Sequence, residues 1–277
     1  MPPAQGVLFA WFSLIQPILH RLRRTVQRLF LLPILVERVK NWPTVLAARV
    51  GLRKIDAVRF RDGSNWHLLD VRPGFAALRD VYLERIYDAR FQLDPGGTIL
   101  DLGANIGMFT VLAAKKLVPE GRVFAVEPNP DVAAVLRRNL AENGISNVEL
   151  IQAAAFTADG EAELQLASHS LGATISKKEH NARSVVVQTI KISRVVEAIG
   201  NVDLLKVDIE GAEWPIFFDS DPRMWKSIKR IAMEFHLDSA EGRTPADLAG
   251  HLSQLGYTNI RIDHPPGLYG YLWAELS

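Results

Sequence analysis

At 277 residues the chain is longer than a typical single domain, which predicts one large catalytic core with an added segment. Its 32 basic and 31 acidic side chains leave a formal net charge of +1 at pH 7, so we expect no nucleic-acid partner. Cysteine is absent, which excludes disulfide bonds, thiolate zinc sites and cysteine nucleophiles.

Residues 7–39 form an apolar segment that is too broken to span a membrane. Gln16 and Pro17 interrupt it short of the ~20 apolar residues that a spanning helix needs. Over residues 20–30, apolar side chains recur at helical spacing and arginines fall largely on the opposite side. This pattern predicts an amphipathic helix that either contacts an anionic membrane surface or packs on the catalytic domain or a second subunit. We therefore expect residues 1–50 to be a helical extension of a cytoplasmic protein, with peripheral contact to the inner face of a membrane as one alternative.

Residues 51–97 are expected to form a small lid that leads into the core. Two strand-like segments, 57–61 and 65–69, flank Asp62-Gly63, a pair that favours the positive φ angles of a hairpin turn. Apolar residues then recur at helical spacing between residues 75 and 91, which predicts a helix in a position to cover a cofactor. The apolar positions of this helix are Leu78, Val81, Tyr82, Leu83, Ile86 and Tyr87.

Residues 98–277 alternate strand-like and helical segments and form the expected catalytic domain. The expected strands are 98–102, 122–126, 148–153, 202–207, 228–235, 259–263 and 268–275. The expected helices are 108–117, 131–143, 192–199 and 244–256. This alternation predicts an α/β fold, with a mostly parallel sheet covered by helices on both faces.

The segment ILDLGANIG, residues 99–107, places a strand, a tight turn and a helix start in immediate succession. Gly103 and Gly107 let the backbone turn sharply and approach a ligand, and the amides of the following helix point into the same space. A nicotinamide dinucleotide needs a glycine at the middle position, where this chain has Asn105. The polar loop instead suits S-adenosylmethionine, whose ammonium group Asp101 can orient directly or through water.

Glu127 ends the next strand roughly twenty residues after Gly107, the spacing of a carboxylate that accepts both ribose hydroxyls of a nucleoside. Small residues in the segment IQAAAF, residues 151–156, suit the face of an adenine ring. The expected cofactor-binding residues are Asp101, Gly103, Ala104, Asn105, Gly107, Glu127, Pro128, Asn129, Ala154 and Asp208.

A second set of polar residues follows the later strands. In VDLLKVDIEGAE, residues 202–213, an apolar strand runs directly into a cluster of acids that begins at Asp208. Ligands of open parallel sheets lie beyond the carboxyl ends of the strands, so Asp208 is expected to face the same crevice as Asp101. Glu234 and His236 alternate at the end of the next strand and point the same way. Methyl transfer needs an aligned acceptor and a base, and we expect Asp208, His236 and Glu234 to be the catalytic residues.

Other roles stay open for these residues. Asp208, Glu210 or Glu234 could hold a divalent cation that acidifies a hydroxyl, but oxygen ligands have no diagnostic spacing and a simple base is favoured. Lys206 could serve only to neutralise a nearby carboxylate. Glu210 and Glu213 could be solvated acids that stabilise a helix N-terminus.

The chain resembles the FkbM family of methyltransferases from the Asp62-Gly63 hairpin to about His236. The motifs that carry the resemblance are ILDLGANIGMF, VFAVEPNP with the downstream Asn139, VDLLKVDIEGAEW and MEFH. The resemblance implies a class I methyltransferase Rossmann-like fold, with a seven-stranded sheet that is parallel except for one strand. It also implies S-adenosylmethionine as cofactor and O-methylation of a hydroxyl on a sugar, glycolipid, polysaccharide or secondary metabolite.

These features together predict an S-adenosylmethionine-dependent O-methyltransferase that acts on a small-molecule or glycan acceptor. One alternative is an NAD-dependent oxidoreductase with a Rossmann fold. Another is a membrane-associated nucleoside-binding scaffold without turnover. No spacing in the sequence encodes the identity of the acceptor, because generic side chains form the walls of an acceptor pocket.

Overall fold

The structure is a computed structural model of the chain. It describes residues 32–69, 77–83, 85–88, 90–166, 173–174, 183–237, 240–264 and 267–277. Most of the amphipathic segment expected over residues 7–39 lies outside this part of the chain. Among the described residues, no helix has the length and apolar character needed to cross a membrane.

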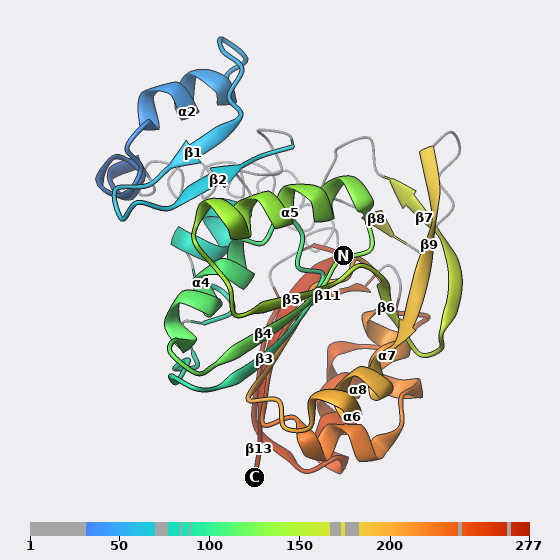
Figure 1. The fold of residues 1–277 in the computed structure, drawn as a ribbon. Coiled ribbons are helices and arrows are strands. Elements are labelled where there is room, and N and C mark those ends of the chain that lie inside the picture. The colour runs from blue at the N-terminus through green and yellow to red at the C-terminus, as the bar shows by residue number, and fades with distance from the viewer. Residues whose placement is uncertain are drawn as a thin grey trace, which may run out of the picture.

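A seven-stranded sheet forms the centre of the molecule (Figure 1). In spatial order its strands are β12 (Tyr257–Asp263), β13 (Tyr269–Leu276), β11 (Arg230–His236), β10 (Leu204–Val207), β3 (Thr98–Leu102), β4 (Arg122–Val126) and β5 (Val148–Ile151). Strand β13 runs antiparallel to both of its neighbours, and the other pairs are parallel. The expected fold class is therefore confirmed, including its single antiparallel strand.

Helices cover both faces of this sheet, because its strands are apolar on both sides. On β3, Ile99 packs into one core cluster and the adjacent Leu100 into the other, as the alternation of strand side chains requires. Helices α4 (Met108–Leu117) and α5 (Pro130–Glu142) lie on the first face, and α6 (Ile192–Ile199), α7 (Glu213–Asp219) and α8 (Pro245–Gln254) lie on the second (Figure 1). The sequence predicted four of these helices to within about two residues at each end, within the usual scatter of helix boundaries. It did not predict α7.

A second sheet of four strands was not expected from the sequence. Its order is β6 (Ala154–Phe156), β9 (Arg183–Lys191), β7 (Gly160–Leu166) and β8 (Ala173–Thr174). Strand β7 alternates small or apolar residues with polar ones, and its first four residues are exposed or half-buried. A strand of this kind has a weaker sequence signal than the continuous apolar strands of the central sheet.

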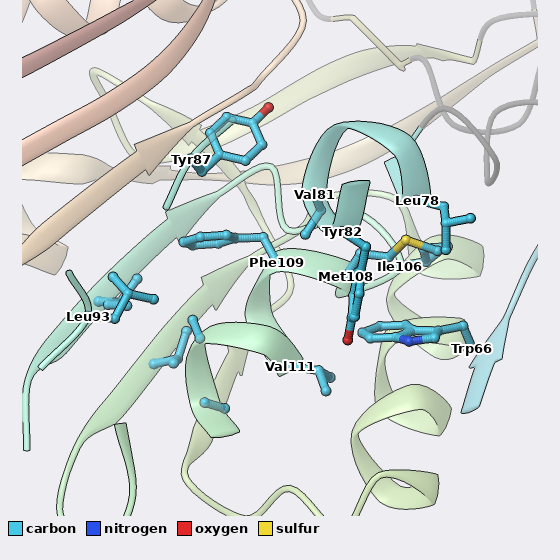
Figure 2. Packing of buried hydrophobic residues seen from close by; sticks show 14 of the residues in the cluster. Trp66, Leu78, Val81, Tyr82, Tyr87, Leu93, Ile106, Met108, Phe109 and Val111 are labelled. Carbon is cyan, nitrogen blue, oxygen red and sulfur yellow. The ribbon is translucent and has the colours of Figure 1, made fainter. Parts of the chain in front are cut away.

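The N-terminal unit, which we define as residues 32–69, contains helix α2 (Trp42–Arg49) and the strands β1 (Ala57–Arg59) and β2 (Asn65–His67). The two strands pair antiparallel, which confirms the hairpin predicted around Asp62-Gly63. Trp66 of β2 packs edge-on against Tyr82, with ring centroids 5.5 Å apart, within the cluster drawn in Figure 2. Hydrophobic contacts thus hold the hairpin to the catalytic core.

The helix expected between residues 75 and 91 is much shorter in the structure. A π-helical turn, Arg79–Leu83, is followed by turns, and Arg85 has a φ of 54°. A positive φ at a residue with a side chain cannot continue a right-handed helix. The prediction of one continuous helix was therefore wrong, although it placed Tyr82 and Tyr87 correctly in the apolar core.

Asn139 of α5 and Asn143, which caps the C-terminus of this helix, form hydrogen bonds to the backbone of β2. The amide of Asn139 accepts a hydrogen bond from the backbone N–H of His67 at 2.7 Å and donates to its carbonyl oxygen at 3.2 Å. Asn143, one turn later, bonds Asn65 in the same way, at 3.1 Å and 2.7 Å. Asn139 also donates to the carbonyl oxygen of Ile106 at 2.7 Å, so a single buried amide joins the hairpin to residues 103–107, the glycine loop.

Candidate active site

The glycine loop follows β3 and touches the loop that follows the neighbouring strand β10. Gly103 has a φ of 74°, and a Cβ atom added there would lie 1.7 Å from the carbonyl oxygen of Asp208. Gly107 has a φ of 87°, and an added Cβ atom would lie 2.1 Å from Leu136. Both positions require glycine, because the loop after β3 touches the loop after β10 on one side and α5 on the other.

Glu127 lies buried at the end of β4 and faces the glycine loop. One carboxylate oxygen accepts a hydrogen bond from the backbone N–H of Asn105 and the other from that of Asn129, each at 2.9 Å. Burial raises the pKa of Glu127 to about 7, although these backbone hydrogen bonds oppose the shift. Each carboxylate oxygen retains a second acceptor position, so two ligand hydroxyls could still bind.

A small cleft of about 60 Å³, open to solvent, lies in front of this loop. Six of the expected cofactor-binding residues line it: Gly103, Asn105, Glu127, Pro128, Ala154 and Asp208. The other four, Asp101, Ala104, Gly107 and Asn129, do not line it. All four are buried in the structure. The cleft is also lined by Ala155 and Leu164, so the unexpected second sheet contributes part of its wall.

Asp101 is paired with Lys206 beneath the cleft. The two residues are opposite each other in the parallel strands β3 and β10, and their charged groups are 3.0 Å apart. The hydroxyl of Thr110 donates to the second oxygen of Asp101 at 2.6 Å, and Asp101 has no exposed surface. Lys206 also donates to the carbonyl oxygen of Gly103 at 2.7 Å. The ion pair thus holds the backbone of the glycine loop in place through the carbonyl of Gly103.

Lys206 remains a cation although it is buried. Burial alone would lower its pKa, but the carboxylates of Asp101 and Asp208 outweigh this effect and raise the pKa of Lys206 above its usual value. Its ammonium nitrogen lies 4.0 Å from Asp208 and 5.2 Å from the centre of the Tyr87 ring. A permanent positive charge therefore lies close to Asp208.

Asp208 lies at the boundary between this cleft and the strand end of β11. Its side chain is 29 % exposed. The hydroxyl of Tyr87 donates a hydrogen bond to its Oδ2 at 3.0 Å. From its sequence context Tyr87 is expected only as an apolar position of a helix, because a single tyrosine among apolar residues gives no sign of a polar role.

The three expected catalytic residues come together at this edge of the sheet. Nδ1 of His236 lies 2.9 Å from Glu213, and Nε2 lies 3.4 Å from Glu210 and 3.7 Å from Glu234. Burial alone would lower the pKa of His236, but the hydrogen bond and charge of Glu213, with the charges of Glu210 and Asp208, raise it to about 10. Burial, reinforced by the charge of Asp208, raises the pKa of Glu234 to about 9. At neutral pH the imidazole is therefore positive and the Glu234 carboxyl is neutral.

Glu213 is fully buried, which the sequence did not predict. Its second oxygen accepts a hydrogen bond from the backbone N–H of Gly211 at 2.9 Å. It lies in the first turn of α7 but binds His236 rather than solvent. Within the described ranges, no group of three or more histidine, aspartate or glutamate side chains is arranged to hold a metal ion.

A family model and two named relatives that match this chain all describe methyltransferases. A family model described as the methyltransferase FkbM domain matches residues 101–258. A relative named Methyltransferase 1, from Beauveria bassiana, is 28 % identical over 179 residues, which cover 56 % of this chain and 71 % of the relative. The 31-O-demethyl-FK506 methyltransferase FkbM of Streptomyces tacrolimicus is 23 % identical over 244 residues, which cover 76 % of this chain and 92 % of that protein.

Among solved structures, this chain is similar to magnesium protoporphyrin IX methyltransferase (ChlM) from Synechocystis PCC 6803 with bound S-adenosylmethionine. The two share 13 % sequence identity with a TM-score of 0.44, over 75 % of this chain and 82 % of that one.

Proposed function

This chain belongs to the FkbM family of S-adenosylmethionine-dependent methyltransferases, and we propose that its acceptor is a hydroxyl group of a sugar, glycolipid, polysaccharide or secondary metabolite. The observation that carries the proposal is the position of Asp208. This carboxylate lines the cofactor cleft and is also hydrogen-bonded by Tyr87 on the side of β11. A base in this place can take the proton of a hydroxyl that is aligned with the methyl donor.

The residues of the cleft fit a nucleoside ligand. Gly103 leaves no room for a side chain between the two loops, so the backbone itself faces the ligand. In the proposal, ionised Glu127 accepts the ribose hydroxyls and Ala154 lies against the adenine ring. Asp101 does not bind the cofactor directly in this proposal, since its carboxylate contacts Thr110 through one oxygen and Lys206 through the other. It holds Lys206, which in turn fixes the carbonyl of Gly103.

The chemistry asks little of the protein beyond alignment and proton removal. S-adenosylmethionine, when bound, would supply a methyl group attached to a positively charged sulfur. The sulfur leaves readily as the neutral thioether of S-adenosylhomocysteine. The acceptor oxygen forms a bond to the methyl carbon as the carbon–sulfur bond breaks, and Asp208 receives the hydroxyl proton. The hydrogen bond from Tyr87 and the nearby ammonium group of Lys206 hold the Asp208 side chain in position for this role.

His236 and Glu234 have different roles in this proposal. A histidine with a pKa of about 10 already carries its proton at neutral pH and cannot act as the base. We assign to it the positioning of Glu210 and Glu234 at the rim of the acceptor site. A neutral Glu234 carboxyl can donate a hydrogen bond, which suits a second hydroxyl of a polyhydroxylated acceptor.

Residues 7–39 are assigned a peripheral contact with an anionic membrane as part of the same proposal. Leu35 and Val39 are buried in the core of the N-terminal unit, so only the residues before them are available for this contact. Deletion of residues 1–31 should therefore weaken sedimentation with anionic liposomes while the enzyme stays folded. Unchanged sedimentation would contradict this assignment.

An acceptor screen tests the proposed reaction. The enzyme is incubated with S-adenosylmethionine labelled with ¹³C in the methyl group and with pools of mono- and oligosaccharides, glycolipids and polyketides. Carbon–proton correlation spectra then distinguish O-methyl from N-methyl and C-methyl products. We expect an O-methyl signal that disappears in Asp208→Asn. A product methylated only on nitrogen or carbon would contradict the proposed acceptor class.

A further inference from the structure

The two parts of the chain carry opposite charges. Residues 1–62 contain 11 lysines and arginines and 3 acidic residues, a net charge of +8. Residues 63–277 contain 21 basic and 28 acidic residues, a net charge of −7. The net charge of the whole chain is nearly zero because a strongly basic N-terminal region is joined to an acidic catalytic domain. Such an asymmetry points to an anionic partner for the basic region.

The loop that joins α2 to β1 combines exposed apolar and basic side chains. Leu52 is 78 % exposed and Val50 is 69 % exposed, the two highest values among the large apolar side chains that the structure describes. Arg49 precedes them, and Arg53 and Lys54 follow directly. In Figure 1 the loop projects beyond α2 and β1 at the end of the molecule away from the central sheet.

The backbone of this loop is held in a defined shape. The N–H of Gly51 donates to the carbonyl oxygen of Ala48 at 3.0 Å, and that of Leu52 donates to Ala47 at 2.8 Å. These bonds satisfy carbonyls at the C-terminus of α2, and Gly51 supplies the positive φ of 80° that the turn requires. The apolar pair is thus presented outward by the helix end and does not fold back onto the protein.

We propose that residues 49–54, the docking loop, bind an anionic lipid surface. Val50 and Leu52 would enter the boundary between headgroups and acyl chains, while Arg53 and Lys54 pair with lipid phosphates and carboxylates. A stable protein–protein interface buries on the order of 1,200–2,000 Å², far more than two apolar side chains provide. A bilayer needs no complementary shape, and apolar residues between basic ones match its layered chemistry.

Single-cysteine labelling tests this contact directly, because the native sequence contains no cysteine. The full-length chain with Leu52→Cys carries an environment-sensitive fluorophore, and Val186→Cys serves as the control. Val186 is 65 % exposed but belongs to β9 of the four-stranded sheet. With phosphatidylcholine vesicles that contain phosphatidylserine, the label at position 52 should shift to the blue and brighten by at least about twofold. The label at position 186 should not respond.

Substitutions separate the loop from residues 7–39, which have their own proposed membrane contact. The variant Val50→Ser/Leu52→Ser should bind the same vesicles about tenfold more weakly, because it removes the apolar part of the contact. The variant Arg53→Gln/Lys54→Gln should lose affinity only for vesicles with anionic lipid. Val186→Ser is the matched control, and all variants should bind S-adenosylhomocysteine as the wild type does.

Two results would overturn the proposal. One is an unresponsive label at position 52 on vesicles that do sediment the protein, since another segment would then make the contact. The other is unchanged vesicle binding by Val50→Ser/Leu52→Ser together with a change in its oligomeric mass, because the loop would then contact protein.

Discussion

The hydroxyl of Tyr87 donates a hydrogen bond of 3.0 Å to Oδ2 of Asp208, although 121 positions separate the two residues in the sequence. The Tyr87 ring packs edge-on against Phe109 at 5.6 Å, and its hydroxyl points away from the apolar cluster (Figure 2). The segment before the central sheet therefore orients a carboxylate at the end of β10. Without this bond Asp208 would keep Lys206, 4.0 Å away, as its nearest charged partner.

The first prediction concerns this hydrogen bond. Tyr87→Phe keeps the ring in its apolar contacts but removes the donor to Asp208. Since hydrogen bonds to charged groups contribute about 1.5–3 kcal/mol, we expect kcat to fall about tenfold or more. The KM for S-adenosylmethionine should change little, because Tyr87 does not line the cofactor cleft. Steady-state kinetics measure both, and a higher KM with unchanged kcat would contradict the assigned role.

The second prediction compares alanine substitutions at two glycines with similar φ angles. Gly103→Ala places a Cβ atom 1.7 Å from the backbone of Asp208, whereas Gly144→Ala meets no atom within 4 Å. Both have a positive φ, of 74° and 65°. Gly144→Ala should cost only the strain of about 1–2 kcal/mol that this conformation imposes. Gly103→Ala should also abolish binding of S-adenosylhomocysteine in a calorimetric titration, and equal effects of the two variants would be inconsistent with the close approach described above.

The third prediction concerns the buried ion pair under the glycine loop. Lys206→Met leaves the buried carboxyl group of Asp101 without its cationic partner, which should lower the free energy of unfolding by about 3–5 kcal/mol. Adding Asp101→Asn removes this unpaired carboxyl group, so the double variant should recover much of this loss. Urea unfolding measures all three proteins. If the double variant is no more stable than Lys206→Met, the pairing does not determine the stability.

The fourth prediction is a pH dependence of cofactor affinity. In the free enzyme the pKa of Glu127 is about 7, and ribose hydroxyls donate to the ionised carboxylate. Affinity should therefore strengthen as the pH rises through 7, by about tenfold between pH 6 and pH 8. Glu127→Gln cannot ionise and should bind more weakly, without this pH dependence. Titrations with S-adenosylhomocysteine measure the effect, and identical pH profiles for both proteins would rule out Glu127 as its source.

The sequence predicted the central sheet well because its strands are short, apolar and bounded by clear turns. The strands β3 and β4 were placed to the residue, and so were α4 and α6. The glycine loop followed from local rules, since Gly103 and Gly107 mark turns that only glycine allows. These features depend on neighbouring residues, which a sequence shows directly.

The missed features depend on contacts between distant segments. Nothing near Tyr87 reveals that it meets Asp208, and nothing near Glu213 reveals that α7 buries it against His236. The sequence also could not show that Lys206 forms an ion pair with Asp101, because their pairing follows from strand order rather than spacing. The four-stranded sheet went unnoticed because its strands are half exposed and leave only a weak alternating pattern.

The central claim is that Asp208 accepts the proton of a hydroxyl acceptor during methyl transfer. The most direct measurement compares the single-turnover rates of the wild type and Asp208→Asn, with the acceptor found in the screen and with both proteins saturated with S-adenosylmethionine. General-base catalysis contributes roughly 10²–10⁴-fold, so the rate of Asp208→Asn should fall at least about 100-fold. A rate within about threefold of the wild type would show that Asp208 is not the base.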